Sequence, residues 1–142
     1  MWTTLLYEFH YRRNEMKIRV TEVLTIEDAL RVGFLSSAGS GTALWSGLKP
    51  TAGQELDVEF DLDEVFYFGE NLKSSSSISP HITAENGAIY ITAEIIQNAD
   101  EEWVALKLAD SIILIELEEP IAQRSGFVEL RTNSIRLYPT NI

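Results

Sequence analysis

The chain has 142 residues, of which 45% are hydrophobic and none is cysteine, and its formal net charge is −11. This size and composition indicate one globular domain over residues 1–142 and argue against an intrinsically disordered chain. The missing cysteines exclude disulfides, thiolate zinc ligands and thiol nucleophiles, and the negative charge argues against nucleic acids and anionic membranes as partners.

The N-terminal residues show no secretory-signal pattern. Glu8 and His10 interrupt their apolar residues, the basic pair Arg12–Arg13 follows these residues instead of preceding them, and no small-residue cleavage site comes next. The longest apolar run, Ile112–Ile115, is far too short to cross a bilayer. The sequence therefore predicts a cytoplasmic protein with no membrane partner.

Two strands and one short helix are expected at the start of the chain. The strands are Thr3–Tyr11 and Met16–Ile26, and the polar residues Arg12–Glu15 form the turn between them. The segment Ile26–Val32 has apolar residues near helical spacing, and Thr25 precedes it as a possible N-cap. This segment is the one helix that the sequence predicts.

The residues Ser36–Gly41 are expected to form a flexible loop. Their Gly-x-Gly pattern is found in phosphate-binding loops, but no Lys-Ser or Lys-Thr follows it. A short strand, Ala43–Ser46, is expected next instead of the helix that a phosphate loop requires. The sequence therefore does not support a nucleotide site here.

The most distinctive stretch runs from Glu55 to Val65, where acidic and apolar residues alternate. A period of two predicts a strand with its apolar residues on one face and its carboxylates on the other. This strand is expected to continue to Phe68. We call its acidic side chains the acidic ladder: Glu55, Asp57, Glu59, Asp61, Asp63 and Glu64.

The second half of the chain reads as a series of strands. The serine-rich residues Asn71–Pro80 are expected to form its longest loop. The clearest hairpin has Asn86-Gly87 at its turn, because these residues supply the two positive φ angles of a type I′ turn. The predicted strands are His81–Glu85, Ala88–Gln97, Trp103–Leu108, Ile112–Leu117, Phe127–Thr132 and Ser134–Tyr138.

The expected fold is mainly β, a small antiparallel barrel or sandwich of about nine strands with one short helix. The strand series of the C-terminal half resembles small barrels of the oligonucleotide-binding type in the order of its elements. No motif accompanies this likeness, so it implies no activity.

The acidic ladder permits several interpretations. As a calcium loop it fails, because Leu62 stands where a glycine is required and Phe68 where a bidentate glutamate is required. As a catalytic pair it fails because nothing marks one carboxylate for a raised pKa. Two interpretations remain: a solvated outer face, which could also protect an edge strand if this strand lay at the edge of its sheet, and a surface that docks a basic partner.

The other candidates for chemistry are also weak. His10 lies among aromatic residues, and His81 follows the serine-rich loop without a Gly-x-Ser-x-Gly motif, so neither indicates a catalytic site. Five aromatic residues form a candidate groove for bases or sugars, although core packing explains them as well. These residues are Trp45, Tyr67, Tyr90, Trp103 and Tyr138.

The sequence thus favours a non-enzymatic, acidic protein-binding module without metal or cofactor. In its most concrete form, this is a cytoplasmic immunity or inhibitor protein whose acidic ladder covers the basic active site of a nuclease toxin. The alternative is a small barrel that binds a small ligand or an oligosaccharide in the aromatic groove.

Overall fold

The computed structural model describes residues 15–98 and 102–140, and within them it contains twelve strands and no helix. The predicted mainly-β fold is confirmed. The strands are β1 Glu15–Ile26, β2 Ala29–Ser36, β3 Gly39–Trp45, β4 Glu55–Leu62, β5 Val65–Phe66, β6 Leu72–Ser75, β7 His81–Glu85, β8 Ala88–Asn98, β9 Trp103–Leu108, β10 Ser111–Leu117, β11 Phe127–Thr132 and β12 Ile135–Pro139.

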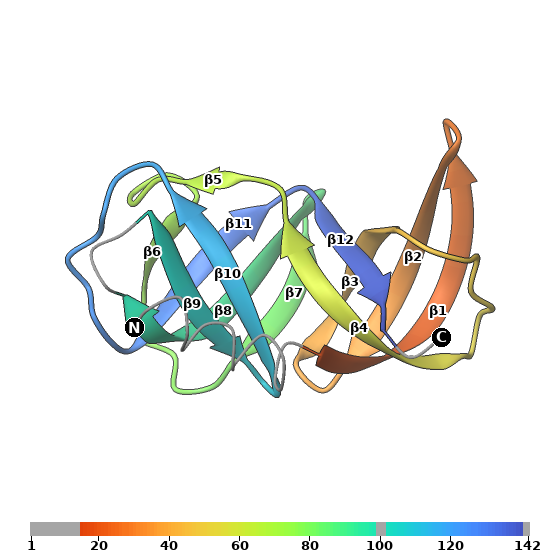
Figure 1. Cartoon of the computed structure of the whole chain (residues 1–142), viewed down its shortest axis with the longest axis horizontal. Coiled ribbons are helices and arrows are strands. Elements are labelled where there is room, and N and C mark those ends of the chain that lie inside the picture. The colour runs from red at the N-terminus through yellow and green to blue at the C-terminus, as the bar shows by residue number, and fades with distance from the viewer. Residues whose placement is uncertain (1–14, 99–101, 141–142) are drawn as a thin grey trace.

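Five strands close into a barrel in the order β1-β2-β3-β12-β4, with β4 pairing back to β1 (Figure 1). The pair β3–β12 is parallel and the other pairs of the barrel are antiparallel. The predicted barrel is therefore confirmed. It is built from the first four strands and the last one, whereas the sequence pointed to the strand series of the C-terminal half.

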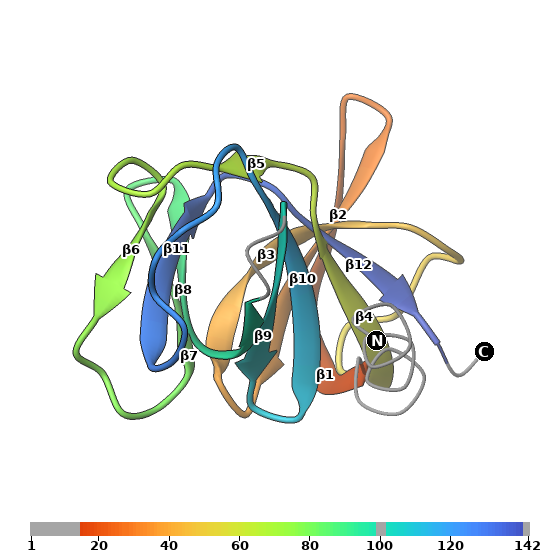
Figure 2. The ribbon, with the colours of Figure 1, turned by 60° about the vertical axis from the view of Figure 1, so that its left-hand side comes forward.

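The remaining strands, β5 to β11, form an outer sheet beside the barrel (Figures 1 and 2). A single parallel pair, Gly39 with Ile82, joins β3 of the barrel to β7 of this sheet. The long strand β8 carries β7 and β9 along one edge and β11 along the other. Buried apolar side chains from the barrel and from the outer sheet belong to one continuous core.

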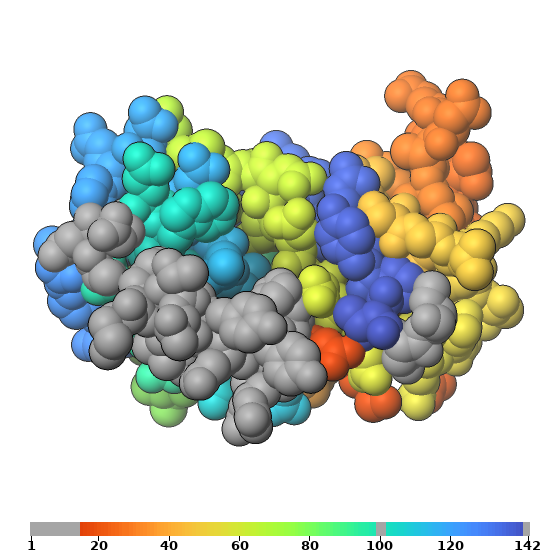
Figure 3. All heavy atoms as spheres, in the orientation of Figure 1, coloured from red at the N-terminus to blue at the C-terminus, as the bar shows by residue number. Residues whose placement is uncertain are grey.

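The predicted helix at Ile26–Val32 is wrong. Glu27 and Asp28 have positive φ angles of 52° and 65°, and they form the two-residue turn between β1 and β2. After this turn Val32 and Phe34 are buried while their neighbours are more exposed, which is strand periodicity. The long pairing of β1 with β2 outweighs the weak helical spacing, and the resulting hairpin projects from the body of the molecule (Figures 1 and 3).

This turn is a place where stability can be gained. Residues other than glycine, asparagine and aspartate are rare at positive φ, and Glu27 is such a residue. We expect the double substitution Glu27→Asn/Asp28→Gly to raise the free energy of unfolding by about 1 kcal/mol. Urea denaturation followed by circular dichroism measures this change. A lower unfolding midpoint would contradict the turn geometry.

Several predicted boundaries shift in the structure. Ser36–Gly41 is a tight hairpin turn with Gly39 and Gly41 inside β3, not a flexible loop. The predicted loop Asn71–Pro80 contains the short strand β6, and the acidic strand ends at Leu62 before β5 begins. The Asn86-Gly87 hairpin is confirmed, with φ angles of 52° and 80°. The predicted strand Thr3–Tyr11 lies outside the described residues.

Candidate functional site

Strand β4 places the acidic ladder on the outer surface of the barrel. Its apolar residues are buried: Leu56, Val58, Phe60 and Leu62 are at most 7% exposed. The alternation predicted from the sequence is therefore confirmed, and the carboxylates of β4 point outward. However, β4 lies between β12 and β1 in the barrel, so the suggestion that its acids protect an edge strand is wrong, whereas the simpler interpretation of a solvated outer face is not contradicted.

The chain's own basic residues neutralise part of the ladder. Arg19 on β1 contacts Glu55 at 3.0 Å, and Lys17 contacts Asp57 at 3.6 Å. These contacts follow from the cross-strand register, which sets each basic residue opposite its acid. The side chains of both basic residues remain more than half exposed, at 57% and 69%, so each ion pair contributes less than about 1 kcal/mol.

The far end of the ladder is held by the last two strands of the chain. Arg136 on β12 contacts Asp63 at 3.3 Å. The hydroxyl of Thr132, at the end of β11, donates a hydrogen bond to Glu64. The ladder therefore faces outward as predicted, but its net negative charge is smaller than the sequence suggested. Among the described residues, its least neutralised carboxylates are those of Glu59 and Asp61.

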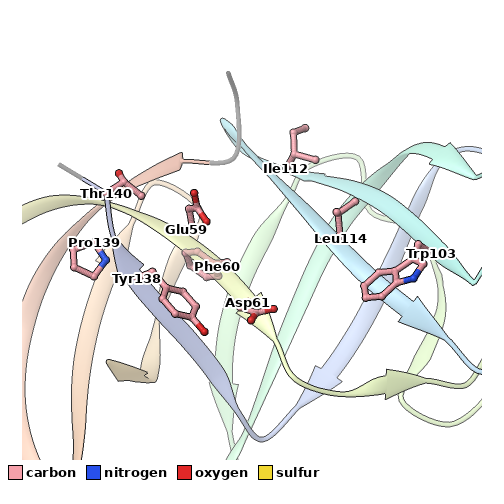
Figure 4. Close-up of a pocket in the computed structure, with 9 residues that line it drawn as sticks. All are labelled: Glu59, Phe60, Asp61, Trp103, Ile112, Leu114, Tyr138, Pro139 and Thr140. Carbon is pink, nitrogen blue, oxygen red and sulfur yellow. The ribbon is translucent and has the colours of Figure 1, made fainter. Parts of the chain in front are cut away.

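Glu59 and Asp61 line a groove of about 480 Å³ between the barrel and the outer sheet (Figure 4). One wall comes from β4 and β12, and the other from β9 and β10. Most of the lining is apolar or aromatic. The lining residues are Glu59, Phe60, Asp61, Trp103, Ile112, Leu114, Tyr138, Pro139 and Thr140.

The groove adjoins a second hollow of about 340 Å³, with which it shares Asp61 and Trp103. This hollow adds Asp63, Glu64 and Glu116 to the lining. Glu116 lies on β10 directly opposite Trp103 in the strand register. The two hollows therefore bring carboxylates from β4, from β10 and from the β4–β5 connection to the same aromatic side chain.

Asp61 is electrostatically distinct from the rest of the ladder. Partial burial raises its pKa above the usual value of 3.8, and the neighbouring charge of Asp63 raises it further. The positive charge of Arg136 acts in the opposite direction and lowers this pKa. The charged form of Asp61 is thus less well solvated than a surface carboxylate, which favours contact with an added cation.

The raised pKa of Asp61 predicts the direction in which stability changes with pH, and this direction can be tested. A folded-state pKa above 3.8 means that the folded protein binds more protons than the unfolded chain between the two pKa values, so stability falls as the pH rises through that window. We expect Asp61→Asn to stabilise the protein at pH 7, by less than about 1 kcal/mol because solvent screens this partly exposed group. The gain is expected to vanish below the unfolded-state pKa.

Urea denaturation at pH 7 and at pH 3 measures this difference. Glu85→Gln, which removes one exposed charge at the end of β7, is the matched control. If Asp61→Asn destabilised the protein at pH 7, the carboxylate would be stabilised in the fold, chiefly by Arg136.

The five aromatic residues of the predicted groove do not come together. Trp45 is 6% exposed and its indole N–H donates a hydrogen bond of 2.8 Å to the carbonyl of Leu48, so it is part of the core. Tyr67 and Tyr90 line two other hollows, neither of which shares a residue with the groove. Trp103 and Tyr138, which are 41% and 37% exposed, do lie in the same groove.

Sequence reasoning did not identify the apolar wall of the groove. Ile112 and Leu114 face it from β10, while Ile113 and Ile115 are buried on the opposite face. The sequence of this strand is nearly all apolar, so its period of two is hidden. Only the carboxylate of Glu116, two residues after Leu114, marks the outward-facing side.

The groove has the chemistry of a cation-binding surface. Carboxylates attract ammonium and guanidinium groups, and exposed aromatic faces such as those of Trp103 and Tyr138 stabilise them through cation–π contacts. Among the described residues, no group of three or more His, Asp or Glu side chains is arranged to hold a metal ion. His81 contacts the Thr92 hydroxyl at 3.3 Å, whereas His10 is not among the described residues.

Comparisons of the chain with protein-family models, with curated protein sequences and with solved structures give no match. Within residues 15–98 and 102–140 the structure contains no helix of the length and apolar character needed to span a membrane.

Proposed function

We propose that this protein is a non-enzymatic, acidic binding module whose acidic ladder receives the lysine and arginine side chains of a basic protein. The observation that supports this proposal most directly is the placement of Glu59 and Asp61 in one groove with Trp103 and Tyr138. The carboxylates supply attraction over distance, and the aromatic side chains supply contact area at short range.

In its concrete form, the proposal is a cytoplasmic immunity or inhibitor protein that covers the basic active site of a nuclease toxin. The carboxylates would take the positions that substrate phosphates occupy against the toxin's basic residues. A net charge of −11 on 142 residues supports fast, electrostatically steered association with such a target. The ion pairs of Arg19 and Lys17 are exposed enough to exchange partners on binding.

The test is capture of a nuclease from the source organism on the immobilised protein, followed by a nuclease assay. We expect one basic protein to be retained at low salt and released at high salt, and its nuclease activity to be inhibited by the free protein. Retention that does not depend on ionic strength, or a nuclease that stays active in the complex, would contradict the proposal.

A second function is favoured by a separate feature of the groove. Trp103 and Tyr138 face the same groove as the apolar side chains of Ile112 and Leu114, a lining that also suits a small ligand or an oligosaccharide. This alternative predicts a change in tryptophan fluorescence on addition of sugars, and the loss of that change in Trp103→Phe. Binding of this kind would depend little on salt, which separates it from the first proposal.

A further inference from the structure

Trp103 is the aromatic side chain that lines both the groove and the hollow beside it. It is 41% exposed, so part of its indole is open to solvent. Glu116 on β10 lies directly opposite Trp103 in the strand register. Opposite residues of an antiparallel pair share one face of the sheet, with Cβ atoms about 5 Å apart. The exposed indole therefore has a carboxylate beside it on its own wall of the groove.

A second carboxylate comes from the opposite wall. Asp61 projects from β4 and lines the same two hollows as Trp103 (Figure 4). The two walls are close to each other, because Cα atoms of β4 and β10 come within 8 Å. Among the described residues, neither Asp61 nor Glu116 takes part in an ion pair. Two carboxylates on different strands thus flank one indole without an ion-pair partner of their own.

This arrangement distinguishes between the two basic side chains. A guanidinium group is flat and has five N–H donors around its edge, so it can stack on an indole and donate to carboxylates on both sides. The ammonium group of lysine is a compact point charge that has no flat face to stack.

The apolar part of the lining acts in the same direction. Leu114 lies on the same face of β10 as Glu116, two residues before it, and it contributes to the wall of the groove. A cation that enters the groove has to give up water against this wall. A guanidinium group is more weakly hydrated than an ammonium group, so the loss of water costs it less.

We propose that the groove is an arginine site, in which a guanidinium group of the partner stacks on Trp103 and donates hydrogen bonds to Asp61 and Glu116. This inference rests on the proposed function and deepens it, because it names the side chain that the basic partner must supply. The net charge of −11 attracts arginine and lysine alike, so the preference for arginine comes from the contacts in the groove.

The test compares two peptides of equal formal charge, octaarginine and octalysine. Isothermal titration calorimetry at about 150 mM salt measures both affinities, because this ionic strength weakens the long-range attraction that the peptides share. We expect the protein to bind octaarginine about tenfold more tightly than octalysine. This ratio is expected to fall to about twofold in Trp103→Leu, whereas Trp103→Phe keeps an aromatic face and is expected to retain part of the preference.

Glu116→Gln is a second variant that changes the site without removing a large side chain. We expect it to lower the ratio of the two affinities about threefold, because the amide is a weaker acceptor for the guanidinium group than the carboxylate. The matched control is Glu85→Gln, which removes an exposed carboxylate outside the groove and is expected to leave the ratio unchanged. Circular dichroism shows whether each variant is folded, and Glu116→Gln provides the test if Trp103→Leu does not fold.

The possible outcomes separate this inference from the proposed function. Equal affinities of the natural protein for the two peptides would overturn the arginine site and leave the binding of a basic partner intact. A preference for octaarginine that persists unchanged in the folded Trp103 and Glu116 variants would also overturn it, because the preference would then arise outside the groove. If neither peptide bound, the proposed function would fail together with the inference.

Discussion

Gly39→Ala is expected to lower the free energy of unfolding by about 3 kcal/mol or more. A Cβ atom at this position would overlap the carbonyl oxygen of Ile82 and would lie 3.0 Å from its carbonyl carbon and 3.1 Å from its amide nitrogen. All three are backbone atoms of β7, which cannot move aside without disturbing the strand pair. The φ angle of Gly39 is 138°, a backbone conformation that residues with a side chain rarely adopt. Both effects act at the one parallel pair that joins the barrel to the outer sheet.

Urea denaturation measures this loss, and Gly53→Ala is the matched control. Gly53 also has a positive φ angle, 93°, but no atom lies within 4 Å of the position that its Cβ would take. Only the backbone strain is added there, so we expect a loss of about 1 kcal/mol. Equal losses for the two variants would mean that the close approach of β3 to β7 does not contribute.

The second large effect concerns binding. We expect Glu59→Lys/Asp61→Lys to weaken binding of an octaarginine peptide by about 30-fold or more, or about 2 kcal/mol, at low ionic strength. The reason is that the double substitution turns two attractive carboxylates of the groove into two repulsive ammonium groups beside Trp103 and Tyr138. Isothermal titration calorimetry at about 50 mM and about 500 mM salt measures the affinity for the peptide and the salt dependence of that affinity.

Glu22→Lys/Glu85→Lys is the matched control, because it changes the net charge by the same amount at exposed positions outside the groove. We expect the control to weaken binding only slightly, through the long-range field of the protein. If both double variants lost the same affinity, the peptide would be responding to net charge and not to the groove. The aromatic side chains would then have no special role in the proposed binding.

The orientation of the acidic ladder could be predicted because it depends on local periodicity. Leu56, Val58, Phe60 and Leu62 alternate strictly with acids, and only one arrangement buries the apolar set, so the carboxylates must face outward. The hairpin at Asn86-Gly87 could be predicted for a similar reason, because the turn chemistry is contained in two adjacent residues.

The turn at Glu27-Asp28 could not be predicted in this way. Its residues are uncommon at positive φ, and the apolar positions of the following strand fit helical spacing nearly as well. Pairing of β1 with β2, and of β2 with β3, decides between the two structures, and these contacts are not visible in the segment itself.

The sequence by itself determined that the protein is mainly β, that β4 has one apolar and one acidic face, and where most of the strands lie, because these properties depend on neighbouring residues. Only the tertiary structure decided that β12 closes the barrel beside β3 and β4, and that Arg19, Lys17 and Arg136 neutralise part of the ladder. It also decided that Trp103 and Tyr138 line one groove with Glu59 and Asp61. These contacts join residues that are far apart in the chain. They follow from strand order and register, which no local pattern of side chains specifies.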